Sequence, residues 1–235
     1  MLHPRLSFWL MIALSFGTGT LDAATYLGMD RVFGANMTGN VILIGLSLAG
    51  SEHVPLLGPL SALGGFAAGS WVLGLILRRV PFAGGRDASL VPVFWTAACG
   101  MLAVTGVLAF LPMNELLIHT VTLAIGIMMG FQAIAARRVG VPDVSTVVIT
   151  STLSLLFSEA GRFWGGATTA ATMRRFAAVA SMFLGAVCGA LLLQLGLWCA
   201  MLVPAMVLIG VALAFTVIQH PSRRVTEDAR TLVSA

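Results

Sequence analysis

Charge is what this sequence has least of. Only 13 of its 235 residues are basic and 9 are acidic, so charged residues make up 9% of the chain, against about 25% in a typical soluble domain. Hydrophobic residues make up 58%, and the mean hydropathy is +0.99. So few charges cannot cover a water-exposed surface, which excludes a disordered chain, a secreted disulfide-rich protein and a soluble nucleic-acid-binding protein. The sequence predicts an integral membrane protein whose partner is the lipid bilayer.

Lysine is absent and cysteine is scarce. All 13 basic residues are arginines, and they stand singly or in pairs at the ends of apolar runs. This placement favours the anionic cytoplasmic leaflet, and not nucleic acid, as their partner. The three cysteines, Cys99, Cys188 and Cys199, lie inside apolar runs. Their odd number and spacing fit neither a disulfide framework nor a metal site, so we expect no metal and no cofactor.

Long apolar runs indicate six transmembrane helices in an all-α membrane protein. Each run is close to the 20 residues that a bilayer-spanning helix needs, and their continuity excludes the short alternating strands of a transmembrane barrel. The expected spans are 6–29, 56–77, 90–111, 115–136, 176–195 and 198–218.

Two further apolar segments, 37–50 and 144–158, are short and rich in Thr, Ser, Asn and Gly. If neither crosses the membrane and the N-terminus is cytoplasmic, twelve arginines lie inside and only Arg31 lies outside, which is the bias of cytoplasmic loops. If both crossed, the loop with Arg78 and Arg86 would be external and the bias would weaken. We therefore expect six full spans, two re-entrant or interfacial short helices, and both termini in the cytoplasm of a bacterial inner-membrane protein.

The two halves of the chain, 1–112 and 113–219, share an order of elements, and 220–235 is expected to be a polar cytoplasmic tail. Each half has a long span, a glycine-rich break, a short Thr-rich helix, a Gly-x-x-x-Gly span and a final span. We assign the Gly-x-x-x-Gly pairs to close helix packing. The matching residues are Gly19 with Gly130, Gly28 with Gly140, Thr38 with Thr150, Leu43 with Leu155, and the pair Gly65 and Gly69 with Gly185 and Gly189.

Three spans per half is an odd number, so the halves must have opposite orientations in the membrane. Inverted repeats with interrupted helices are characteristic of secondary transporters, and by this analogy we expect a small-molecule transporter or channel. The structural alternative is that two broken helices simply pack together.

Four short motifs add a resemblance to a known family. The stretches LDAATYL at 21–27, FGANMTGN at 33–40, GFQA at 130–133 and GVPDVST at 140–146 resemble, in content, order and spacing, the YoaK family of bacterial inner-membrane proteins. That family is a domain of unknown function with suggestions of small-molecule transport, so the resemblance implies a topology and motif positions but no substrate. The chain departs from the family's usual Gln-Asn-Ala at Ala133 and from its Leu-Thr-Gly-Thr at Ser151, and no role for the replaced Asn and Gly carries over.

Asp22 is the one acidic residue well inside an expected full span. A carboxylate near the bilayer centre costs about 2.5–3.5 kcal/mol on insertion scales, so such residues usually face a cavity or a partner and mark a functional path. A carboxyl group there can also exchange protons, which allows proton-coupled transport. The structural alternative is that Asp22 forms hydrogen bonds to the nearby break, to Asn36 or Asn40.

The starts of the short helices supply the other candidate substrate-binding residues. Asn36, Thr38 and Asn40 lie at the first and Asp143 and Thr146 at the second, and all are residue types that cap helix N-termini. Helix capping alone explains each of these residues taken singly. It does not explain why polar caps occur at matched positions in both halves of a membrane protein.

We expect the two helix N-termini to approach each other in the membrane interior. Their unpaired amides would favour an anionic or carbonyl-bearing ligand, mainly at Asn36–Asn40. Thr150 and Gln132 would complete one polar cavity that Asp22 also reaches.

Two other functional classes remain as alternatives. An intramembrane enzyme would need a metal-binding His-Glu-x-x-His, a Ser-His or Ser-Lys pair, or two facing aspartates. The four histidines lie at span ends and only Asp22 is intramembrane, so we expect no catalytic residues and no enzyme. An accessory or assembly subunit would show a fixed protein partner. A homo-oligomer is compatible with both a transporter or channel and an accessory subunit.

Overall fold

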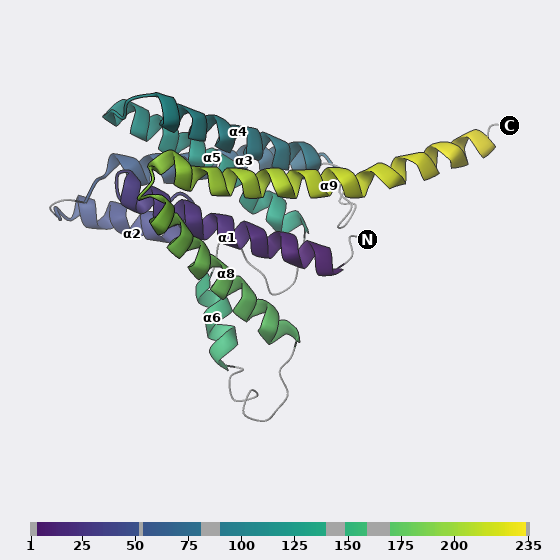
Figure 1. Cartoon of the computed structure of the whole chain (residues 1–235), viewed down its shortest axis with the longest axis horizontal. Coiled ribbons are helices and arrows are strands. Elements are labelled where there is room, and N and C mark those ends of the chain that lie inside the picture. Colours follow the sequence, from purple (N-terminus) through teal and green to yellow (C-terminus); the bar gives the residue numbers. More distant parts are fainter. Residues whose placement is uncertain (1–3, 52–53, 81–89, 140–148, 159–169, 234–235) are drawn as a thin grey trace.

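The computed structural model describes residues 4–51, 54–80, 90–139, 149–158 and 170–233. Within these ranges all regular secondary structure is α-helical (Figure 1). The helices are α1 (Pro4–Gly28), α2 (Met37–Leu48), α3 (Leu57–Arg78), α4 (Leu90–Phe110), α5 (Glu115–Val139), α6 (Ile149–Ser158), α8 (Ala170–Leu192) and α9 (Leu197–Val233).

Six of these helices are long and apolar enough to cross a bilayer, the same number as the spans that the sequence predicts. The fifth differs most from its expected range of 176–195, because the pair Arg174–Arg175 lies within the helix and not before it. The spanning segments are Leu6–Gly28, Leu57–Arg78, Leu90–Phe110, Glu115–Val139, Ala171–Leu192 and Leu197–Val217.

The two short segments also form helices. The first, α2, fills most of the expected range 37–50. The second, α6, begins at Ile149, while residues 140–148 lie outside the described part of the chain. At the C-terminus, α9 continues without a break to Val233 and projects beyond the bundle (Figure 1), so the expected tail is helical over most of its length. Arginine, glutamate and alanine in this tail are good helix formers.

Closely packed glycines join the spans in two parallel pairs. A Cβ atom on Gly65 would meet the carbonyl oxygen of Leu123, and one on Gly69 would meet that of Ile127. The residue numbers rise together, so α3 and α5 run parallel with their backbones in contact. In the same way, Gly185 of α8 lies against Phe16 of α1. The Gly-x-x-x-Gly motifs thus allow close helix packing as expected, across the two halves of the chain.

The third pair of spans, α4 and α9, is antiparallel. The rings of Phe94 and Phe215 stack with their centroids 5.0 Å apart, and Trp95 Nε1 donates a hydrogen bond of 3.0 Å to Thr216 Oγ1. Near the other end of the two helices, Thr105 Oγ1 donates to the carbonyl oxygen of Met201 at 3.3 Å. Side chains of α1, α4, α5 and α9 together form most of the buried core.

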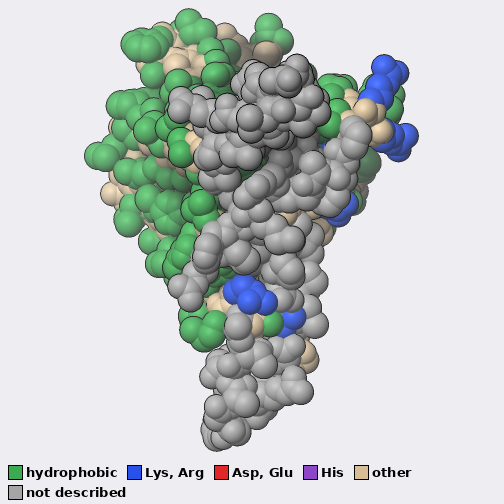
Figure 2. All heavy atoms as spheres, turned by 90° about the vertical axis from the view of Figure 1, so that its right-hand side faces the viewer, with side chains coloured by type: hydrophobic (Ala, Val, Ile, Leu, Met, Phe, Trp, Pro, Cys, Tyr) green, Lys and Arg blue, Asp and Glu red, His purple; other side chains and the backbone are tan. Residues whose placement is uncertain are grey.

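These directions place six helix ends at one end of the bundle. Three are starts, those of α1, α4 and α8, and three are ends, those of α3, α5 and the α9 span. Contacts of Arg138, near the end of α5, show that α3 and α5 end together. Its two terminal guanidinium nitrogens donate to the carbonyl oxygens of Leu77 (2.9 Å) and Val80 (2.7 Å) at the end of α3. We call this the arginine end, and Figure 2 looks onto it and shows blue arginine side chains. Its described arginines are Arg78, Arg79, Arg137, Arg138, Arg174 and Arg175.

The opposite end, which we call the α2 end, holds the break between α1 and α3. Because α1 ends and α3 begins there, the chain over 29–56, including α2, leaves and returns at the same end of the bundle. The outward faces of the spans carry large apolar side chains, such as Trp71 (68% exposed) and Phe183 (66% exposed). Such faces are stable only against lipid, since a water-exposed surface this apolar would aggregate.

Candidate functional site

The chain folds back on α1 after Gly28. Backbone amides of the break form hydrogen bonds with side chains of α1: Gly34 N donates to Thr25 Oγ1 at 3.0 Å, and Ala35 N donates to Asp22 Oδ1 at 2.7 Å. Asp22 lies six residues before the end of α1, or about 9 Å along its axis. The residues that lead into α2 therefore lie at the depth of Asp22, inside the end of the bundle.

The carboxylate of Asp22 has two oxygens in different situations. Oδ1 accepts hydrogen bonds from Ala35 N and, at 3.3 Å, from Asn36 N. Oδ2 is buried and has no hydrogen-bond partner among the described residues, and the whole side chain is only 7% exposed. A buried charged oxygen without a partner is unfavourable by several kcal/mol. Asp22 therefore holds the break in place and still presents one acceptor.

Asn36 and Asn40 hold the same break from the α2 side. Asn36 is the N-cap of α2, and its Oδ1 accepts a hydrogen bond of 3.1 Å from Gly39 N. Asn40 is fully buried; its Oδ1 accepts from Phe33 N at 2.9 Å and its Nδ2 donates to Phe33 O at 2.7 Å. An amide side chain carries a donor and an acceptor on separate atoms, which suits asparagine at this position.

These bonds change the expected chemistry of the α2 N-terminus. The sequence favours an anionic or carbonyl-bearing ligand there, because helix N-termini leave amides unpaired. In the structure, the amides of Ala35, Asn36 and Gly39 already have side-chain acceptors. The buried side-chain atom of this break that has no partner among the described residues is an acceptor, Asp22 Oδ2, and an acceptor suits a hydrogen-bond donor or a cation.

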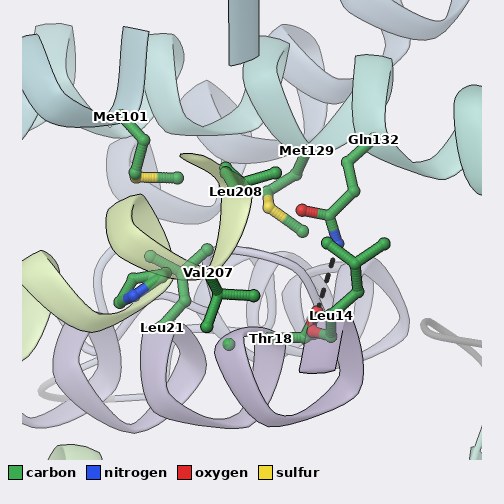
Figure 3. Close-up of a pocket in the computed structure, with 10 residues that line it drawn as sticks. Leu14, Thr18, Leu21, Met101, Met129, Gln132, Val207 and Leu208 are labelled. Carbon is green, nitrogen blue, oxygen red and sulfur yellow. Dashed lines mark hydrogen bonds between the residues drawn. The ribbon is translucent and has the colours of Figure 1, made fainter. Parts of the chain in front are cut away.

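Gln132 belongs to α5 and contacts α1 at Thr18, apart from the break. It is 4% exposed, and its Nε2 approaches Thr18 Oγ1 at 3.4 Å, a long hydrogen bond. Beside this pair lies a cavity of about 10 Å³ between α1, α4, α5 and α9 (Figure 3). This volume is close to that of one water-sized sphere, and its other walls are apolar, including Leu14, Met101 and Met129.

The remaining expected site residues do not join this group. Thr38 and Thr150 are both exposed, and α2 packs against α3 whereas α6 packs against α8. Asp143 and Thr146 lie outside the described residues. The structure thus brings Asp22, Asn36 and Asn40 together, leaves Gln132 about one helical turn away beside Thr18, and does not bring the two threonines to them.

Sequence reasoning missed the other polar residues of α1. Ser15, Thr18 and Thr25 are each 2% exposed or less and are buried on α1 as Asp22 is. Their spacing from Asp22 is that of one helix face, so helical periodicity could have identified them. Together the four residues form a polar stripe on α1, directed into the bundle, from its middle to the α2 end.

The sequence is similar to known proteins over most of its length. Residues 10–214 match the family model described as "Protein of unknown function (DUF1275)". The UPF0700 transmembrane protein YoaK of Bacillus subtilis (strain 168) is 33% identical over 159 residues, which cover 66% of this chain and 68% of that protein. No solved structure matches the chain. With six apolar candidate spans among its described residues and a transmembrane relative, the chain is an integral membrane protein, and it belongs to the DUF1275 family.

Proposed function

We propose that this protein is a non-enzymatic transporter or channel for a small molecule in the bacterial inner membrane, with its binding site at the break between α1 and α2. The observation that carries the proposal is Asp22, a carboxylate 7% exposed within a spanning helix, whose Oδ2 has no partner among the described residues. Its Oδ1 accounts for a structural role. The second oxygen is not needed for that role, and an intramembrane carboxylate is kept at a cost only where it has a use.

The packing of the helices supports an inverted repeat. If α1, α2, α3 and α4 are matched with α5, α6, α8 and α9, most of the main packing pairs map onto each other. The packing of α1 against α8 corresponds to that of α5 against α3, and the packing of α1 against α9 corresponds to that of α5 against α4. The packing of α2 against α3 corresponds to that of α6 against α8, and the pair α4 and α9 maps onto itself. This is the pattern of a two-fold axis in the membrane plane, as in many secondary transporters.

The glycine contacts favour a slightly different alignment of the halves than the sequence does. A Cβ atom on Gly19 would meet Met182 and Ala186 of α8, and one on Gly126 would meet Ala62 and Phe66 of α3. Gly19 therefore corresponds to Gly126 in its contacts. The sequence echo pairs it with Gly130 instead, which lies one turn further along the same face.

Orientation can be tested with reporter fusions. Because arginines favour the cytoplasmic side, we expect the arginine end, with both termini, to be cytoplasmic and the α2 end to be periplasmic. Alkaline phosphatase, which is active only in the periplasm, should be active when fused after residue 54 and inactive after residue 84; green fluorescent protein should give the opposite pattern. Phosphatase activity at 84 without activity at 54 would reverse the orientation.

Transport can be tested without knowing the substrate. Proteoliposomes that contain the full chain are incubated with a defined pool of metabolites, and mass spectrometry measures which compounds accumulate inside. We expect at least one compound to accumulate with the wild-type protein and not with Asp22→Asn, at equal protein content. If no compound moves and the protein instead purifies in a fixed ratio with another membrane protein, an accessory role replaces transport.

A further inference from the structure

The ligand chemistry of the Asp22 site follows from what its hydrogen bonds leave over. The amides of Ala35 and Asn36, just before α2, donate to Asp22 Oδ1, and the amide of Gly39 donates to Asn36 Oδ1, so a carboxylate already lies at the N-terminal end of α2. An anion at this place would meet the negative charge of Asp22 in a medium of low dielectric constant, where repulsion is strong. A cation would instead meet a free carboxylate oxygen.

The distribution of charge along the bundle agrees with this polarity. The three acidic side chains that the structure describes are Asp22, Asp30 and Glu115, and all lie toward the α2 end. Of the arginines whose side chains are described, only Arg31 lies at that end. A cation that approaches from the α2 end is therefore attracted, whereas the arginine end repels it.

The site limits the charge and the size of its occupant. One carboxylate neutralises one positive charge, and a divalent ion would leave a net charge buried at considerable cost. The described part of the chain contains no group of three His, Cys, Asp or Glu side chains that could hold a metal ion. Ala35, whose amide donates to the carboxylate, is 1% exposed, and Leu21 beside it in the chain is fully buried, so a bulky occupant would have to displace packed side chains.

We propose that Asp22 Oδ2 binds a compact monovalent cation, either an alkali ion or the ammonium group of a small amine. The inference rests on the site of the proposed function and specifies its ligand: the cation is the transported species or its coupling ion. A second place for a cation exists at the same end, an open depression of about 250 Å³ lined by Asp30, Glu115 and His119 among others. The test must therefore separate the two places.

The purified full chain is melted in buffers of constant ionic strength, in which N-methylglucamine chloride is replaced by sodium, potassium, ammonium or methylammonium chloride. An anion series replaces chloride by acetate or phosphate. Ligand binding to the native state raises the melting temperature, and we expect a saturable rise of about 3 °C or more with at least one cation and none with the anions. Comparing the rise in melting temperature with sodium or potassium to the rise with the two ammonium salts distinguishes an alkali ion from an amine.

Two variants locate the site. Asp22→Asn is expected to lose the cation-dependent rise, and Glu115→Gln, a matched change in an exposed acid, is expected to keep it. The opposite pattern would place the cation in the depression and overturn the proposal, as would a rise with anions alone. If Asp22→Asn does not fold, isothermal titration of Glu115→Gln with the active cation decides: one site per chain supports the proposal, and no saturable binding overturns it.

The result is distinguishable from a failure of the proposed function. If the cation binds at Asp22 but proteoliposomes accumulate nothing, the cation site is supported and the transport proposal is contradicted. If proteoliposomes accumulate a compound and no cation binds, the transport proposal is supported and the assignment of a cation to Asp22 is contradicted.

Discussion

Gly65→Ala is expected to lower the melting temperature of the purified protein by about 5 °C or more, whereas Gly64→Ala leaves it unchanged or slightly higher. A Cβ atom on Gly65 would overlap the backbone carbonyl oxygen of Leu123. A backbone atom cannot move aside as a flexible side chain can, so α3 and α5 must separate. Overpacking of this kind costs about 1–3 kcal/mol or more, and 1 kcal/mol corresponds to roughly 2–4 °C in a protein of this size.

Gly64 is a matched control because it precedes Gly65 on the same helix and receives the same methyl group. It is exposed, and a Cβ atom there would meet nothing within 4 Å. Alanine is the better helix former by about 1 kcal/mol, so any effect should be stabilising. Melting followed by tryptophan fluorescence, with gel filtration to detect aggregation, measures both variants. Equal losses at the two positions would show that glycine matters for α3 itself, and no loss at Gly65 would contradict the close contact with α5.

The spans could be predicted from sequence because lipid imposes a simple requirement, a continuous apolar helix of about 20 residues. The close packing of glycines could also be predicted, since only small residues let backbones touch. Which helices touch could not. Gly65 and Gly185 lie in similar motifs, and nothing local to either motif indicates that one packs against α5 and the other against α1.

The site could be predicted in part. Asp22, Asn36 and Asn40 stand out because polar residues in an apolar segment need partners, and the structure places them together. The polarity of the proposed ligand could not be deduced from sequence, because it depends on which amides find an internal acceptor. Thr38 and Thr150 illustrate the same limit: their residue type suits a pocket, but the face of a short helix that points inward is set by its packing, and both are exposed.

The second large effect is expected from Asp22→Ala. This change removes the acceptor of two backbone amides, Ala35 N and Asn36 N. Each buried amide left without a partner costs about 1–3 kcal/mol, so the loss of both bonds weakens the break by about 2–6 kcal/mol. Hydrogen exchange measured by mass spectrometry should show fast exchange in a peptide that covers residues 33–40, together with a lower melting temperature.

Asp22→Asn separates the two roles of the carboxylate. The asparagine oxygen can replace Oδ1 and accept from Ala35 N, so the break should stay protected from exchange and the melting temperature should remain within a few degrees of the wild type. The amide nitrogen replaces Oδ2 and removes the negative charge, so binding at that atom should disappear. Thr25→Val is the control for the break alone, because it removes one acceptor, that of Gly34 N, and leaves Asp22 in place.

The three variants therefore give a pattern that a purely structural role cannot produce. If Asp22 only held the break, Asp22→Asn would resemble the wild type in every measurement, including the response of its melting temperature to cations. If Oδ2 binds a cation, Asp22→Asn keeps the protected break and loses that response, while Thr25→Val exchanges faster around Gly34 and keeps it. Equal exchange in Asp22→Ala and Asp22→Asn would contradict the assignment of Oδ1 as the atom that holds the chain at the depth of Asp22.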